Sequence, residues 1–286
     1  MILVSSGIDL IRLCKSLAPL ESGAELDQEG CLLDRHPPAI TGIGGIPAII
    51  SESAIILGEG DTIALWYLPG ALARPMPSHI MAGLGPLHDP FQRSITNKGW
   101  RISSNYFRNG GISSGCLEFS PARHLWGHET WKHQPMVENI CLPSALLSGA
   151  LSTMHPSLYQ AGLQAMEGLN AWSAEQDGIM VEALAHWSTV YTNFSVIANQ
   201  CTPLHHDPHS QPDWYDLLAT VGEYDNCFLD IPTLGTQLRD SVTQDVGDRC
   251  CLAYYMQDNV HNWLCISRPD WMIVDNVWHA LLMEEL

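Results

Sequence analysis

The hydrophobic pattern of the chain changes its period after residue 187, and this change limits the folds that it can adopt. Before the change, apolar residues recur at helical spacing in three segments, 143–155, 157–172 and 179–187. Pro156 is expected to break the first of these, and Ser157 to cap the second. After the change, β-branched and aromatic residues predict strands at 190–198, 228–231 and 250–256. Helices followed by strands predict an α+β fold with a β-rich second half.

The first half of the chain predicts a hairpin, an N-terminal arm and loops. Two β-rich runs, 53–57 and 62–67, flank a short Gly-containing turn, which is typical of a hairpin. Residues 1–37 predict a loosely attached arm, and residues 75–135, rich in Gly, Ser, Pro and Asn, predict mostly loops. Because 286 residues lie near the upper limit for one hydrophobic core, we expect a single domain over residues 38–286.

Composition excludes several classes of protein. Hydrophobic residues make up 46% of the chain, which excludes disorder as its main state. The best apolar stretch, 39–57, is interrupted by Gly, Pro, Ser and Glu, and so does not predict a membrane span. The N-terminus lacks the basic flank of a secretory signal, and the nine cysteines form no Cys-x-x-Cys pair. We therefore expect a nuclear or cytoplasmic protein with reduced thiols that is neither secreted nor in a membrane.

The charge of the chain is strongly acidic but unevenly distributed. Thirteen Lys and Arg oppose 31 Asp and Glu, and the net charge of −18 argues against a general binder of phosphate backbones. Six basic residues nevertheless fall in one short stretch: Arg93, Lys98, Arg101, Arg108, Arg123 and Lys132. They predict either a basic face on which DNA could lie or scattered, solvated side chains.

Two familiar motifs fail on their spacing. Gly42-Ile-Gly44-Gly45 resembles a dinucleotide-binding loop, but Pro47 occupies the position where the third glycine is needed. His128 and His133 are five residues apart, whereas a zinc-protease helix needs four. His124 and His128 have that spacing, but no third ligand accompanies them. Neither a dinucleotide site nor a zinc protease is therefore expected.

The tripeptide His205-His206-Asp207 is the strongest candidate for a metal site. It follows a predicted strand, and residues two apart in an extended chain share a face, so the His205 imidazole and the Asp207 carboxylate would point to the same side. These are two of the three ligands of a 2-His-1-carboxylate site, which leaves open positions on Fe(II). A single His-x-Asp is weak evidence, because most such tripeptides are polar loops.

Longer stretches around this tripeptide carry a family resemblance: TPLHHDPHSQPDWYDLLATVGEYDNCFLDIPTLGTQLR and GDRCCLAYYMQDNVH. Three upstream segments match as well: SAIILGEGDTIALWYLPG, GCLEFSPARHLWGHE and ALLSGALSTMHPSLYQAGLQAMEGL. Together, from about Ile49 to about Asp275, they resemble the fungal branch of the TET/JBP family of Fe(II)- and 2-oxoglutarate-dependent dioxygenases. The resemblance implies a double-stranded β-helix (jelly-roll) core over 190–265, helical support over 143–187, and oxidation of the methyl group of a 5-methylpyrimidine, expected to be 5-methylcytosine, in DNA.

The resemblance also implies roles for individual residues. His205 and Asp207 match the first two iron ligands, and Arg249 matches the arginine that binds the distal carboxylate of 2-oxoglutarate. A guanidinium suits that role because its planar fork can bind a carboxylate bidentately. The alternative for Arg249 is a surface ion pair with Asp248 or Asp245. His209 and Trp214 are candidate residues of the substrate pocket, although an aromatic residue there is more often part of the core.

The sequence departs from the family pattern before Arg249. The pattern continues after Leu238-Arg239 with a turn, another strand and a second metal-binding His, whereas here the chain runs directly to Arg249. The β-helix is therefore expected to be incomplete by one strand, through a true loss or a mispredicted intron. Asp240 lies near the expected His and is our candidate for the third metal ligand; the alternatives are His261 and His279. A working dioxygenase and a degenerate paralogue with a structural or nucleic-acid-binding role both stay open.

Overall fold

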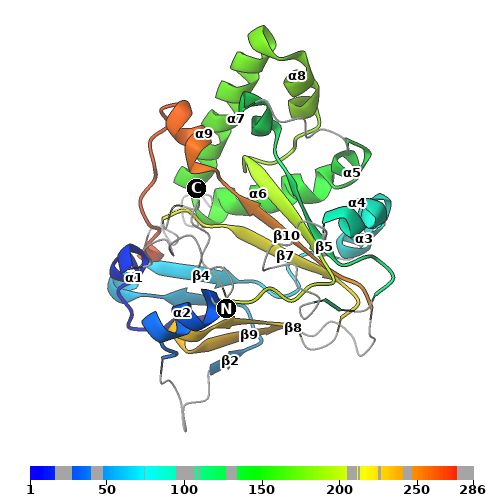
Figure 1. The fold of residues 1–286 in the computed structure, drawn as a ribbon. Helices are drawn as coiled ribbons and strands as arrows, with labels where there is room; N and C mark the ends of the chain where they lie inside the picture. Colours follow the sequence, from blue (N-terminus) through cyan, green and yellow to red (C-terminus); the bar gives the residue numbers. More distant parts are fainter. Residues whose placement is uncertain are drawn as a thin grey trace.

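The computed structural model describes residues 1–16, 28–39, 48–73, 75–94, 107–108, 110–126, 134–204, 211, 213–224, 227–240 and 247–275. Over this part the chain combines helices with three small sheets, so the predicted α+β class is confirmed (Figure 1). No sheet formed by the described strands closes on itself, and the double-stranded β-helix stays a prediction. Among the described helices, none has the length and apolar character needed to cross a membrane.

The largest sheet is antiparallel and has four strands in the order β5-β6-β10-β7. The strands span Gly115–Phe119, Asn193–Ala198, Arg249–Tyr255 and Leu217–Gly222. Alternate residues of β10, namely Cys250, Leu252 and Tyr254, are fully buried in the main hydrophobic core. The same core holds Phe194 and Val196 of β6 together with apolar residues of the helices. One face of the sheet is therefore covered by helices, and the residues between these, such as Arg249 and Cys251, face the other side.

The helices on the covered face are α3 to α7, which contribute Ile80, Phe91, Val137, Leu151 and Leu158 to the core. Their bounds are Met76–Leu84, His88–Ser94, Gln134–Asn139, Cys141–Met154 and Pro156–Gln176. Two further helices, α8 (Gly178–Ala185) and α9 (Asp258–Trp263), form a smaller apolar cluster with α7. Short 3-10 turns lie at Gly85–Leu87 (η4) and Pro121–Trp126 (η8).

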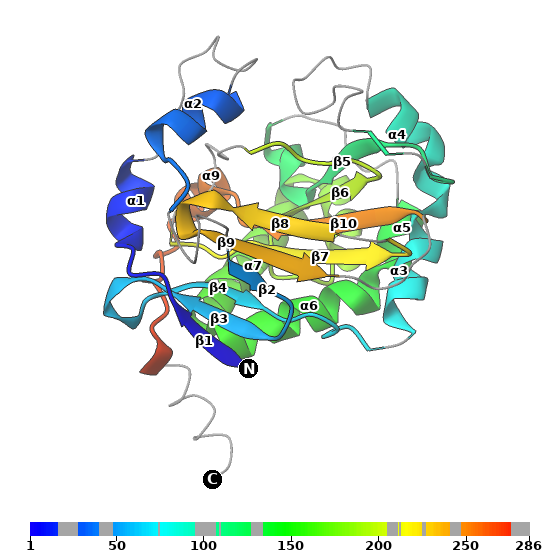
Figure 2. The same ribbon diagram turned by 90° about the horizontal axis from the view of Figure 1, so that it is seen from below.

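A three-stranded sheet lies against the opposite face of the four-stranded sheet, as Figures 1 and 2 show from two directions. Its order is β2-β9-β8, with bounds Ala48–Ile50, Thr236–Asp240 and Cys227–Ile231. β9 pairs with β2 in parallel and with β8 in antiparallel orientation. The 3-10 turn η9 (Pro232–Leu234) and Gly235, with φ of 60°, connect β8 to β9. The molecule thus has a helical layer, a four-stranded sheet and a facing smaller sheet.

The third sheet contains the predicted hairpin. β3 (Ala54–Leu57) and β4 (Ile63–Tyr67) pair in antiparallel orientation around the 3-10 turn η3 (Glu59–Asp61), which confirms that prediction. β1 (Ile2–Ser5) pairs in parallel with β3, and Leu10 of α1 (Leu10–Ser16) is buried against the hairpin. Residues 2–5 and Leu10 of the expected arm thus pack against the hairpin, whereas residues 17–27 lie outside the described part. Helix α2 (Gln28–Arg35) follows.

The structure confirms the three predicted helices but differs from the expectations for their ends and for residues 75–135. The three predicted helices are confirmed as α6, α7 and α8, but Pro156 begins α7 instead of only ending α6. The cap of α7 is His155 and not Ser157, because the Nδ1 atom of His155 accepts a hydrogen bond from the Leu158 backbone N–H at 3.2 Å. Within 75–135, the described residues include α3, α4 and β5, so the prediction of mostly loops was wrong there.

Candidate functional site

Arg249 stands at the start of β10, on the face of the sheet turned away from the helices. Its Nη1 atom donates a hydrogen bond to the Sγ atom of Cys227 on β8 at 3.2 Å. Its Nη2 atom donates to the carbonyl oxygen of Gln200, which lies two residues beyond β6. The guanidinium group therefore bridges the two facing sheets, at the point where the chain leaves β6 toward His205.

The alternative for Arg249 was a surface ion pair, but the described contacts of Asp248 are hydrogen bonds with the segments around Arg249. The Oδ1 atom of Asp248 accepts hydrogen bonds from the Ile112 backbone N–H at 2.9 Å and from the Nδ2 atom of Asn199 at 2.7 Å. Its backbone carbonyl accepts from the Glu223 N–H at 3.0 Å. Asp248 thus links the start of β10 to three neighbouring segments. Asp245, the other partner considered, lies outside the described residues.

Asn199 is the centre of this network. Its side chain is 1% exposed; Nδ2 also donates to the Ile112 carbonyl at 2.8 Å, and Oδ1 accepts from the Arg249 backbone N–H at 2.8 Å. Its φ of 44° lies in the left-handed region, which asparagine tolerates better than other non-glycine residues. The conformation ends β6 and aims the amide at β10. Asn199 therefore fixes the backbone from which the Arg249 side chain extends.

A glycine lets β7 approach this network closely. Gly222 has φ of 124°, and a Cβ atom there would lie 2.0 Å from the Asp248 carbonyl oxygen. Gly222 is paired with Arg249 in the sheet register. Any larger residue would force β7 away from the start of β10, so the glycine is required by the geometry of the site.

Asp240, the candidate third metal ligand, is the last residue of β9. Its Cα partner across the β8–β9 pair is Cys227, the residue whose sulfur accepts from Arg249. The structure therefore brings the backbone of Asp240 to the same place as Arg249, although the Asp240 side chain is outside the described part. His205, Asp207 and His209 also lie outside the described residues.

The segment that leads to these residues is described as far as Leu204. The Leu204 backbone N–H donates to the Oε1 atom of Glu29 on α2 at 3.3 Å. Helix α2 thus lies beside the entry to the His205 segment. Over the described residues, no group of three or more His, Cys, Asp or Glu side chains gathers in a way that could hold a metal ion.

Trp214 and His261 lie at the other end of β10. Leu217, three residues after Trp214, pairs with Tyr254, whereas Arg249 pairs with Gly222. At ~3.4 Å per residue, five residues of β10 separate the two ends by roughly 17 Å. The structure therefore does not bring Trp214 or His261 together with Arg249. His279, the remaining alternative ligand, is outside the described residues.

The surroundings of Trp214 are those of a core residue. The ring is 7% exposed and lies 4.5 Å, centroid to centroid, from the His261 ring. Burial lowers the pKa of His261, so its ring is neutral at pH 7, with Nδ1 3.2 Å from the Gln257 carbonyl oxygen. The Arg268 guanidinium lies 5.9 Å from the centroid of the Trp214 ring. Trp214 therefore joins β7 to α9 through ring contacts.

The two adjacent cysteines of β10 are poor candidates for metal ligands. Burial raises the pKa of the Cys250 thiol to about 12. Burial also raises the pKa of Cys251, although a hydrogen bond with Thr220 and the charge of Arg249 oppose the shift. Both thiols are therefore protonated at neutral pH, and a metal ligand must be a thiolate.

The sequence did not reveal a polar cluster on the same face of the sheet as Arg249. The Oε1 atom of Glu118 accepts hydrogen bonds from the Tyr255 hydroxyl at 2.9 Å and from the Nδ2 atom of Asn193 at 2.6 Å. The Ser195 hydroxyl lies 3.4 Å from that of Tyr255. Burial, with the nearby charge of Glu118, raises the pKa of Tyr255, so the phenol stays protonated. The polar residues Asn193 and Ser195 alternate with apolar residues along β6, and this period of two could have indicated the cluster.

The six basic residues of the predicted DNA-binding face do not all lie together. Arg93 is in the last turn of α4, next to Ser94, whose hydroxyl accepts from the Cys116 N–H of β5 at 3.2 Å. The Arg108 carbonyl accepts from Ser114, the residue before β5, at 3.1 Å. Arg123 instead follows the other end of β5, in η8, and its side chain is not described. Lys98, Arg101 and Lys132 lie outside the described residues.

The described part thus joins Arg249, Cys227, Gln200 and the backbone of Asp240 at one end of the sheets. The network of Asn199 and Asp248 holds this end in place. No family model matches the chain, and no curated protein matches it.

Proposed function

We propose that this chain is an Fe(II)- and 2-oxoglutarate-dependent dioxygenase that oxidises the methyl group of a 5-methylpyrimidine in DNA, with 5-methylcytosine as the base. The observation that carries the proposal is the environment of Arg249. The Arg249 guanidinium group is held between two facing sheets and bonds to Gln200, which precedes the His-x-Asp tripeptide in the sequence. A guanidinium group in this position is suited to bind a carboxylate beside a metal. The sequence resemblance supports the same assignment.

The arrangement of the strands supports a jelly-roll core. Such a core consists of two facing, mainly antiparallel sheets. The four-stranded sheet and the β8–β9 pair face one another in this way (Figure 2), and the polar side chains of β6 and β10 lie on the side turned away from the helices. We propose that these strands form a double-stranded β-helix that lacks one strand between β9 and β10.

The residues present fit the co-substrate. Arg249 has five N–H donors, and its two described hydrogen bonds leave others for a carboxylate. His205, Asp207 and Asp240 would hold Fe(II), which together with 2-oxoglutarate and oxygen supplies the oxidising chemistry when bound. Arg249 would orient the co-substrate by its distal carboxylate, and Asn199 would fix the position of Arg249 through its backbone.

The DNA substrate must present its base to such a site. A base in a duplex has to be flipped out of the stack before an enzyme can reach its methyl group. His209 is the proposed residue of the pocket for that base, whereas Trp214 is buried in the core at the other end of β10. Contacts with the DNA backbone would involve Arg93 and Arg108, which flank the start of β5. Because the net charge is −18, this binding should be weak and salt-sensitive.

Substituting Arg249 tests whether this residue binds 2-oxoglutarate. Arg249→Lys keeps the positive charge but removes the planar fork, and we expect the dissociation constant for 2-oxoglutarate to rise about ten- to a hundred-fold, the loss of ~1.5–3 kcal/mol. The constant is measured by titration calorimetry in the presence of Mn(II) without oxygen. Arg239→Lys, on the exposed surface of neighbouring β9, is the control and should leave it unchanged. Equal affinities for 2-oxoglutarate in wild type and Arg249→Lys would refute the role of Arg249.

One specific observation favours the degenerate alternative. β9 ends at Asp240 and β10 begins at Arg249, so few residues connect two strands of different sheets. A chain that has lost the strand with the second metal-binding His could keep the fold without the chemistry. It would then bind neither Fe(II) nor Mn(II), and 2-oxoglutarate would not raise its melting temperature. Sequencing the transcript decides whether the strand is truly lost.

A further inference from the structure

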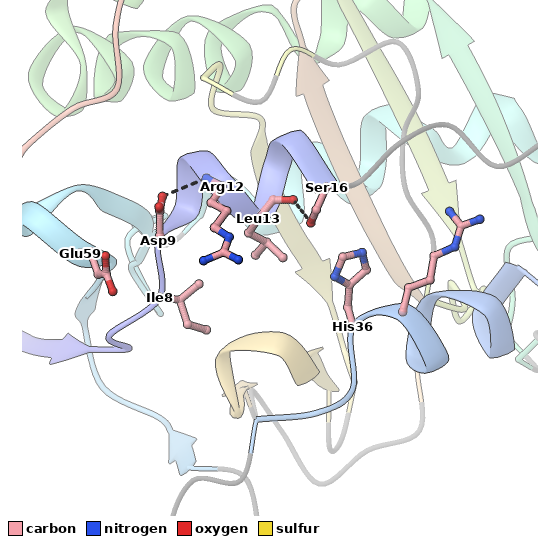
Figure 3. A pocket seen from close by; sticks show the side chains of 8 residues that line it. Ile8, Asp9, Arg12, Leu13, Ser16, His36 and Glu59 are labelled. Carbon is pink, nitrogen blue, oxygen red and sulfur yellow. Dashed lines mark hydrogen bonds between the residues drawn. The ribbon is translucent and has the colours of Figure 1, made fainter.

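A second candidate binding site lies near the N-terminus, and none of its residues belongs to the site proposed above. It is a hollow of about 450 Å³ between α1, the end of α2 and η3 (Figure 3). Its lining consists of Ile8, Asp9, Arg12, Leu13, Ser16, Arg35, His36 and Glu59. The volume falls within the range of small-molecule sites.

The walls of the hollow are held by backbone contacts. The Glu59 N–H donates to the Ile8 carbonyl at 2.9 Å, which joins the start of α1 to the turn of the hairpin. A Cβ atom on Gly58 would lie 2.5 Å from the Leu10 side chain, so the glycine permits this close packing. On the other side, the Ala39 N–H donates to the Pro232 carbonyl at 2.8 Å and holds the segment after α2 against η9. The hollow is therefore formed by the fold itself.

Two arginines of the hollow lack counter-charges within the described structure. The Arg12 and Arg35 side chains have no ion pair with any described carboxylate, whereas Arg268 is paired with Asp258. The carboxylate of nearby Asp9 is used differently, because its Oδ1 atom caps α1 by accepting from the Arg12 backbone N–H at 2.9 Å. Guanidinium groups that pair with no described carboxylate, in a chain of net charge −18, are available to an anion.

His36 gives an independent indication of a ligand. Its Nε2 atom is shielded from solvent and has no hydrogen-bond partner. A buried ring nitrogen without a partner costs free energy, which a bound group could recover. Figure 3 shows the His36 ring and the Arg12 guanidinium group extending into the same space, with Leu13 beside them. The Arg12 guanidinium group and the His36 ring thus both line the hollow.

We propose that this hollow binds a small organic molecule by an anionic group, a phosphate or a carboxylate. Arg12 holds the charge, and His36 Nε2 forms a hydrogen bond with the same group. Glu59 and the second oxygen of Asp9 accept hydrogen bonds from hydroxyl or amino groups elsewhere on the molecule. Ile8 and Leu13 pack against its carbon skeleton.

The test measures the binding of two simple anions to the full chain. Inorganic phosphate and malonate are titrated separately at constant ionic strength, with chloride as the reference, and binding is followed by the melting temperature and by the ¹⁵N signal of the His36 ring. We expect saturable stabilisation by at least one anion and a shift of the His36 signal. In Arg12→Gln the dissociation constant should rise at least tenfold. Lys15→Gln, on the same helix but outside the lining, should bind as wild type does.

The relative affinities for phosphate and malonate show which anionic group the hollow prefers. Stronger binding of phosphate points to a phosphorylated ligand, and stronger binding of malonate to a carboxylate. The proposal is overturned if neither anion stabilises the folded protein more than chloride does. It is also overturned if Arg12→Gln binds as tightly as wild type, or if Lys15→Gln loses as much affinity as Arg12→Gln, since the effect would then come from the general charge of α1.

Discussion

Replacing Asn199 should both destabilise the fold and weaken the binding of 2-oxoglutarate. Its side chain makes three buried hydrogen bonds, one with the Asp248 carboxylate and two with the backbones of Ile112 and Arg249. At ~0.5–1.5 kcal/mol for each backbone bond and ~1.5–3 kcal/mol for the charged one, their loss should cost about 2.5–6 kcal/mol. This is a large fraction of the ~5–15 kcal/mol by which domains are stable.

Two substitutions of Asn199 separate the contribution of its hydrogen bonds to stability from the contribution of its backbone conformation. Asn199→Gly loses the bonds but accepts the φ of 44° freely, whereas Asn199→Ala loses the bonds and is also strained. We expect Asn199→Ala to be less stable than Asn199→Gly by about 1 kcal/mol. The free energies of unfolding are measured by urea denaturation, and Asn170→Ala, at an exposed position of α7, serves as the control that should change little.

The same variants test the positioning of Arg249. In Asn199→Gly, at a temperature where the protein is still folded, the affinity for 2-oxoglutarate should fall, because the Arg249 backbone N–H has lost its acceptor. A role in stability alone would leave that affinity unchanged. If both variants lie within about 1 kcal/mol of wild type, the network around Asn199 does not exist as described and the reasoning is refuted.

Three further predictions concern other parts of the molecule. Gly222→Ala should destabilise the fold by about 3 kcal/mol or more in urea denaturation, because its Cβ would lie 2.0 Å from a carbonyl oxygen at a φ of 124°; a loss below 1 kcal/mol would contradict this. Burial lowers the pKa of His155, so the unfolded chain takes up the proton first, and stability should fall as the pH drops below about 6.5, by up to ~1.4 kcal/mol per pH unit from this residue. His155→Gln should reduce that slope and exposed His79→Gln should not; equal slopes would refute the assignment. Neutralising Arg101 and Arg108 together should weaken binding to methylated duplex DNA in low salt, and unchanged binding would mean that these are solvated side chains.

The helices of the second half could be predicted from the sequence because each is long and strongly periodic. The sequence predicts α7 but misplaces its start, because Pro156 indicates the end of one helix, although proline is also favoured in the first turn of the next. The sequence does not predict α3 and α4, because both helices are short and each contains a proline, and the tertiary burial of Ile80 and Phe91 stabilises them.

The strands that the sequence does not predict pair with strands that are far away in the sequence. β7 pairs with β10 and β9 pairs with β2, and no local pattern marks such pairing. The candidate site likewise combines a residue indicated by the sequence with contacts that depend on the fold. The family resemblance indicates Arg249 as a site residue, but the contacts of Arg249 with Cys227 and Gln200 join segments that are far apart in the sequence. The network of Asn199 likewise required the fold to be known.

Turnover of methylated DNA tests the central claim most directly. The folded protein is incubated with Fe(II), 2-oxoglutarate, oxygen and a duplex that contains 5-methylcytosine, and succinate and oxidised base are quantified by mass spectrometry. A dioxygenase should release about one succinate for each methyl group oxidised, and His205→Ala should release neither product. If wild-type protein yields no more succinate and no more oxidised base than His205→Ala does, the chain is not a working dioxygenase of methylated DNA.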